Sequence, residues 1–173
     1  MMMRVLEQGG LPILADGIRV ANEDNPKGYY EFERVKKLSE GDSAWLIEAP
    51  GKAVKIIAAL LVHLPSTYTF KVLFMRRRMS EVLASQRVML ERRGEDADAI
   101  DDAEMARLFE AHVAQVKDWM DQQPNVTYLD VDYNGVLSEP EMWLAKVHGF
   151  LGMPLDLKAM TAVVDPNLYR QRS

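Results

Sequence analysis

The sequence of 173 residues contains no cysteine and only three histidines. The absence of thiols excludes disulfide bonds, thiolate metal sites and cysteine nucleophiles. No apolar run approaches the roughly 20 residues that a membrane-spanning helix needs. The longest such run, IIAALLV at 56–62, is flanked by Lys55 and His63. The N-terminus also lacks the apolar core and the cleavage site of a signal peptide, so we expect a cytoplasmic protein without a membrane partner.

The chain has no excess of positive charge, since its formal net charge is −5. An acidic total disfavours general binding to nucleic acid or to anionic membranes, and we expect neither as a partner. The acids are densest at 95–104, where six of ten residues are Asp or Glu. A solvated loop that runs into a helix N-terminus explains this stretch, with carboxylate metal binding as the alternative. We expect no metal cofactor.

Strand-like and helical segments alternate along the chain. Short apolar runs predict strands at 52–57, 69–75 and 126–131. Helical segments are predicted at 31–40, 43–49, 80–93, 101–122, 139–151 and 157–163. The length suits one domain, 1–173. This alternation predicts an α/β fold whose parallel sheet is flanked by helices on both sides, in three layers.

Two serines predict helix starts. Ser80 is expected to cap the helix at 80–93. Ser138 and Glu141 have the spacing of a capping box, with Pro140 in the first turn and Gly152 after the last turn. These signals predict that the helix at 139–151 begins immediately after Ser138.

The densest basic cluster, Arg76 to Arg78, follows the predicted strand at 69–75 and precedes a helix. In open α/β sheets, ligands bind beyond the carboxyl ends of the strands, near helix N-termini. An arginine fork pairs two donors with two phosphate oxygens, and a helix N-terminus adds N–H donors. Ser85 lies about one and a half turns into that helix, where a hydroxyl can reach the same anion. The cluster therefore predicts a phosphate site, with surface ion pairing as the alternative.

The arrangement of a strand, Arg77, seven residues and then Ser85 resembles the 3′-phosphate-binding segment of sulfotransferases that use 3′-phosphoadenosine-5′-phosphosulfate. Two further blocks are similar to segments of that family: residues 129–154, which end in FLGMP, and DNPKGYYEFERVKKL at 24–38. The three blocks follow the family's order over most of the chain. The resemblance implies a P-loop NTPase-like sulfotransferase fold and transfer of a sulfuryl group to a hydroxyl or amine of a small-molecule acceptor, whose identity it does not give.

The resemblance also implies roles for individual residues. Arg77 and Ser85 would hold the 3′-phosphate. Tyr133 matches a family tyrosine near the adenine, although packing in a turn explains it equally well. Arg170 falls where the family supplies further basic contacts, with a frayed tail as the alternative. Lys55 matches a family lysine that stabilises the bridging oxygen.

The resemblance does not assign a general base directly, because Ile57 stands where many members have a catalytic histidine. Glu31 is the candidate for this role if burial raises its pKa. An exposed residue near a helix N-terminus is the alternative reading of Glu31.

The family's phosphosulfate loop and the strand before it have no counterpart in the sequence. Gly51-Lys52 does not complete a phosphate-loop pattern, which also disfavours a nucleotide kinase. We therefore expect an N-terminally truncated chain with weak or no catalysis, and a non-catalytic nucleotide-binding or scaffold homologue as the alternative. A sheet without that strand would leave unpaired backbone edges, which favours pairing in a homodimer.

Overall fold

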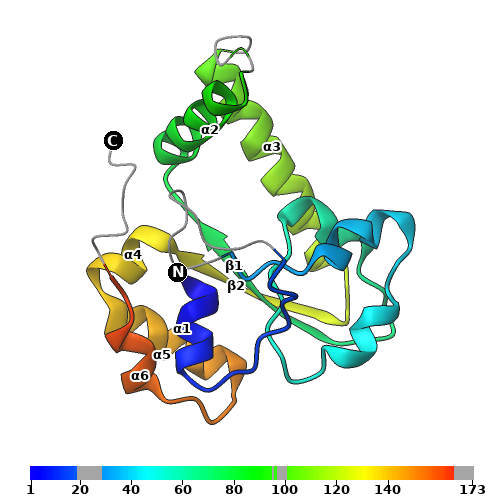
Figure 1. Cartoon of the computed structure of the whole chain (residues 1–173), viewed down its shortest axis with the longest axis vertical. Helices are drawn as coiled ribbons and strands as arrows, with labels where there is room; N and C mark the ends of the chain where they lie inside the picture. The colour runs from blue at the N-terminus through cyan, green and yellow to red at the C-terminus, as the bar shows by residue number, and fades with distance from the viewer. Residues whose placement is uncertain (19–28, 95, 97–100, 166–173) are drawn as a thin grey trace.

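The sheet of this protein consists of two parallel strands, β1 (Phe70–Arg76) and β2 (Val126–Asp132) (Figure 1). The structure is a computed structural model, which describes residues 1–18, 29–94, 96 and 101–165. Phe70 lies opposite Val126 and Arg76 opposite Asp132. The helical elements are α1 (Met2–Gln8), η1 (Glu33–Glu40), η2 (Ala44–Glu48), η3 (Ala58–His63), α2 (Met79–Arg93), α3 (Asp102–Asp121), α4 (Tyr133–Ser138), α5 (Pro140–Leu151) and α6 (Leu157–Ala162). The predicted α/β class is confirmed.

The connection between the two strands passes through α2 and α3. Parallel strands need a crossover of this kind, because the chain must return to the end at which the first strand began. In Figure 1, α2 and the first half of α3 stand away from the sheet as a helical pair. The carboxyl ends of both strands therefore lie at the same end of the sheet, below α2 in Figure 1.

The sheet separates two hydrophobic cores. Successive side chains of a strand point to opposite faces, and in β1 the residues Phe70, Val72 and Phe74 pack with the core that contains Trp45 and Met120. Leu73 packs instead against the core formed by α1, α5 and α6. Helical elements therefore cover both faces of the strands (Figure 1).

Strand prediction was wrong at 52–57. Only Ala53 forms a bridge, parallel to Ile13. The N–H of Ala53 donates to the Pro12 carbonyl at 2.8 Å, and the N–H of Leu14 donates to the Ala53 carbonyl at 2.9 Å. The other side of this segment lines a cavity, so no second neighbour extends the pairing into a strand.

Both serine caps were also wrong. Helix α2 begins at Met79 with Arg78 as its N-cap, and Ser80 is an exposed residue of the first turn. Ser138 ends α4, where its hydroxyl donates to the Gly135 carbonyl at 3.3 Å, and Glu139 is the N-cap of α5. The prediction that Pro140 lies in the first turn of this helix is confirmed, because α5 begins at Pro140.

Gly152 follows α5 with a positive φ of 64°, as the sequence pattern predicts. The end of α5 is also tied to the sheet, because Lys71 Nζ donates to the carbonyls of Phe150 and Leu151 at 3.0 and 2.8 Å. Across the described ranges, none of the helices combines the length and the apolar composition needed to cross a bilayer.

Candidate functional site

Arg77 and Tyr133 lie side by side at the carboxyl ends of the two strands. They are the residues that directly follow Arg76 and Asp132, the last paired residues of β1 and β2. The guanidinium carbon of Arg77 lies 5.0 Å from the centroid of the Tyr133 ring, in the range of a cation–π contact. Burial raises the pKa of the Tyr133 phenol, against the opposing effect of Arg77. The structure thus brings together two of the four residues proposed to bind the nucleotide.

Glu81 is a member of this cluster that the sequence analysis missed. Its side chain is fully buried, with an exposed fraction of 0%. Arg77 Nε donates to Glu81 Oε2 at 2.7 Å, and Asn134 Nδ2 donates to Glu81 Oε1 at 2.8 Å. The spacing of Arg77 and Glu81, four residues across a helix start, was a visible signal for the ion pair. The buried Glu81 carboxylate, in the first turn of α2, therefore connects Arg77 at the end of β1 to Asn134 of α4.

Ser85 and the other arginines of the cluster lie at the surface. Ser85 is exposed on α2, six residues after Met79 and thus about 9 Å further along the helix axis. Arg76 and Arg78 are exposed on either side of Arg77. Arg170 lies outside the described residues. The proposed phosphate site therefore consists of one partly buried arginine with exposed polar side chains around it.

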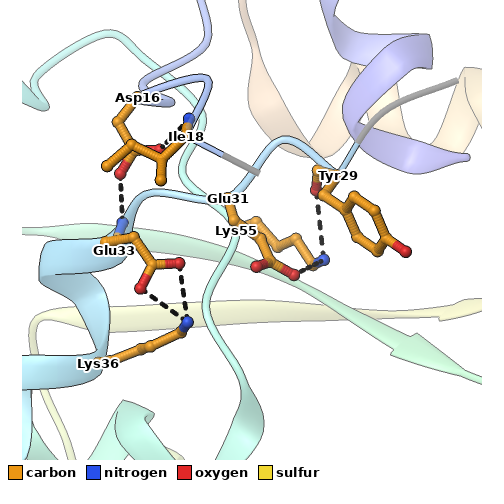
Figure 2. A network of polar contacts seen from close by, with 7 residues as sticks. All are labelled: Asp16, Ile18, Tyr29, Glu31, Glu33, Lys36 and Lys55. Atoms are coloured by element: carbon orange, nitrogen blue, oxygen red, sulfur yellow. Dashed lines mark hydrogen bonds and ion pairs between the residues drawn. The ribbon is translucent and has the colours of Figure 1, made fainter. Parts of the chain in front are cut away.

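Lys55 and Glu31, the two proposed catalytic residues, are in direct contact (Figure 2). Lys55 Nζ donates to Glu31 Oε1 at 3.2 Å and to the Tyr29 carbonyl at 3.3 Å. The exposed fractions of the two side chains are 40% for Lys55 and 19% for Glu31. Separate elements supply the pair, since Glu31 precedes η1 and Lys55 follows the bridge at Ala53. The pairing places a cation and a carboxylate within reach of one ligand.

The loop that carries Glu31 is held by Asp16. Its carboxylate accepts the N–H of Glu33 at 2.6 Å and the N–H of Ile18 at 3.0 Å, as Figure 2 shows. These two backbone hydrogen bonds hold the pKa of Asp16 below its usual value. The N–H of Asp16 in turn donates to the Glu31 carbonyl at 3.1 Å. Asp16 therefore holds the main chain at Glu31 and at Glu33.

Tyr30 joins the same loop to α1. It has a φ of 52°, which is uncommon for a residue other than glycine. Its hydroxyl donates to Glu7 Oε2 at 2.6 Å. Burial and this hydrogen bond raise the pKa of Tyr30 to about 12.

Stability at alkaline pH is expected to depend on Tyr30. A raised pKa means that the folded state favours the neutral phenol, so its contribution is complete below pH 10.0 and is lost as the pH rises toward about 12. Tyr30→Phe should lower the free energy of unfolding by about 0.5 kcal/mol at neutral pH, because Tyr30 is only partly buried and its partner Glu7 is exposed. Urea titrations across the interval should show the two proteins converging. A constant difference at every pH would contradict the assignment.

A cavity of about 910 Å³ lies beside these residues. Lys55, Tyr29, Tyr30 and Tyr133 contribute to its lining. Most of the remaining wall is apolar and comes from α1, β1 and the segment 51–56. Among the described residues, no group of three or more His, Asp or Glu side chains is placed to hold a metal ion.

Comparison with known protein families, with curated proteins and with solved structures finds no match to this chain. The fold and the site by themselves define an α/β protein. An arginine–tyrosine pair lies at the carboxyl ends of its parallel strands, next to a largely apolar cavity.

Proposed function

We propose that this chain is a sulfotransferase-like protein with a three-layer, P-loop NTPase-like fold, which binds 3′-phosphoadenosine-5′-phosphosulfate across the carboxyl ends of β1 and β2. The contact between Arg77 and Tyr133 carries this proposal. A guanidinium group can form two hydrogen bonds to the oxygens of a phosphate, and an aromatic ring can stack on a purine base. Their position at the ends of adjacent parallel strands is where ligands of open α/β sheets bind. The proposal includes a cytoplasmic location.

The proposed reaction transfers a sulfuryl group to an acceptor hydroxyl or amine. The sulfur–oxygen bond to the phosphate breaks, a bond from sulfur to the acceptor forms, and adenosine 3′,5′-bisphosphate leaves. Glu31 takes the acceptor proton, and Lys55 stabilises the charge on the leaving oxygen. The contact of these two side chains at 3.2 Å supports a common role.

One observation favours the alternative of a non-catalytic nucleotide-binding or scaffold protein. Arg77 already pairs with the buried Glu81, so at least one of its donors serves the fold. An arginine with this role would stay in place in a homologue that has lost catalysis. Nucleotide binding is therefore the property to test before turnover.

Calorimetric titration with adenosine 3′,5′-bisphosphate tests the proposal. Arg77→Lys keeps a cation beside Glu81 but loses the arginine fork, so it should weaken binding by about tenfold or more. Arg107→Lys makes the same exchange on the exposed surface of α3 and should have no effect. Adenosine 5′-monophosphate should bind more weakly, because it lacks the 3′-phosphate. Equal binding of both nucleotides, or no effect of Arg77→Lys, would contradict the assignment of Arg77 to the 3′-phosphate.

A further inference from the structure

Strand β1 has one edge that is open to pairing. The N–H of Phe70 donates to the Asn125 carbonyl at 2.8 Å, so the main-chain groups of Phe70 face β2. Main-chain groups alternate in direction along a strand. Val72 and Phe74 therefore also face β2, whereas Lys71, Leu73 and Met75 direct their N–H and C=O groups to the opposite edge. Among the described strands, β1 is hydrogen-bonded to β2 alone.

The cavity lies along this open edge. Every residue from Phe70 to Met75 contributes to its lining, and the segment 51–56 lines it as well. Ala53 directs its main chain toward 12–14, so its neighbour Val54 directs its own main chain away from that partner. Strand β1 and the segment 51–56 thus border one space.

The walls of this space come from both hydrophobic cores. Trp45 and Leu61 belong to the core on one face of the sheet, and Leu6 and Leu151 to the core on the other face. Backbone N–H and C=O groups in apolar surroundings need hydrogen-bond partners, since an unpaired buried group is costly. Another extended main chain supplies such partners at the same spacing as the main-chain groups of β1. A compact small molecule does not.

We propose that this cavity is a slot for a β-strand donated by a partner protein, which pairs with the open edge of β1. Because six residues of β1 border the slot, the donated segment is about six residues and about 20 Å long. A strand covered on both faces is apolar at every position, as in buried parallel sheets. This mode of recognition is strand addition. The inference does not depend on the proposed nucleotide binding.

Charge complementarity defines the flanks of the donated segment. The charged side chains in the cavity lining are four cations and one acid: Arg4, Lys52, Lys55, Lys71 and Asp165. Lys55 already pairs with Glu31, and the remaining excess of cations over the one acid favours acidic residues beside the apolar run. The partner segment is therefore a short run of β-branched residues between glutamates or aspartates.

Amide hydrogen exchange measured by NMR tests the slot residue by residue. The probe is a synthetic peptide with blocked ends, in which alternating valine and isoleucine form a six-residue core between pairs of glutamates. The peptide should slow exchange by about tenfold or more at Lys71, Leu73 and Met75, whose amides face the slot. Exchange at Val72 and Phe74 should not change, because those amides already bond to β2. The same peptide with N-methylated core residues is the control, since it keeps the side chains but has no donors.

A pair of variants at Met75 tests the same contact from the protein side. Its side chain is 37% exposed, and its N–H faces the slot. Met75→Pro removes this N–H without removing a bond to β2, and edge positions tolerate proline. The dissociation constant of the peptide should rise by about fivefold or more. Met75→Ala loses the same side chain but retains the N–H, so it is the reference against which this fivefold loss in Met75→Pro is measured. If Met75→Pro does not fold, the exchange experiment alone tests the proposal.

Three results would overturn the proposal. The first is unchanged exchange at the three amides when the peptide is in large excess. The second is equal protection by the N-methylated peptide, which would indicate apolar binding without strand pairing. The third is a dimer of the chain alone in which the three amides are already protected, since a second copy would then occupy the slot.

Discussion

Replacing Trp45 with alanine is expected to lower the free energy of unfolding by about 4 kcal/mol. Trp45 has an exposed fraction of 0%, and its ring meets Phe32 edge-on at a centroid distance of 5.4 Å. Its indole N–H donates to the Asp42 carbonyl at 3.0 Å, so the truncation removes a hydrogen bond in addition to apolar contacts. Domains of this size have a total stability of roughly 5–15 kcal/mol, so this single change removes a large part of it.

Urea unfolding followed by circular dichroism measures this effect. Ile47→Ala is the matched control, because Ile47 lies two residues further along η2 with an exposed fraction of 74%. Its truncation should change the free energy of unfolding by less than about 0.5 kcal/mol. Phe32 directly follows Glu31, so loss of the ring contact should also loosen the loop beside Lys55. A loss below about 1 kcal/mol in Trp45→Ala would show that this core is less tightly packed than the structure indicates.

The sequence predicted β1 and β2 for a simple physical reason. Both strands are short apolar runs bounded by polar residues, and each is followed by a polar or charged residue. Since parallel strands end at one edge, residues just beyond two neighbouring strands lie close together. Tyr133 itself was assigned only through the family resemblance, and its contact with Arg77 is a finding of the structure.

The features that the sequence did not predict depend on contacts between distant segments. The run at 52–57 has strand-like residues, yet pairing requires a neighbour, and only Ile13 supplies one. The capping box at Ser138 failed because α4, a separate helix capped by Asp132, occupies the preceding residues. Burial of Glu81 depends on Asn134, which lies 53 positions further along the chain. Acidic residues are seldom fully buried without partners, and the local sequence reveals only Arg77.

Loss of the Arg77 side chain is expected to destabilise the fold as well as to weaken nucleotide binding. Arg77→Ala removes the ion pair at 2.7 Å and leaves the buried Glu81 carboxylate with the Asn134 amide. Removal of one partner from a buried pair leaves an uncompensated charge, so the free energy of unfolding should fall by about 3 kcal/mol. The low end of the usual range applies because the exposed fraction of Arg77 is 26%. Urea unfolding at neutral pH measures the loss.

A double-mutant cycle separates the fold from the site. Glu81→Gln in the Arg77→Ala background removes the buried negative charge and should recover about 1 kcal/mol or more, whereas adenosine 3′,5′-bisphosphate binding should not return. Recovery of stability without recovery of binding would assign Arg77 to the nucleotide as well as to Glu81. A full return of binding in the double variant would instead mean that Arg77 acts only by keeping α2 and α4 in place. Wild-type stability in Arg77→Ala would contradict the buried ion pair itself, because removal of a cationic partner from a buried carboxylate is costly.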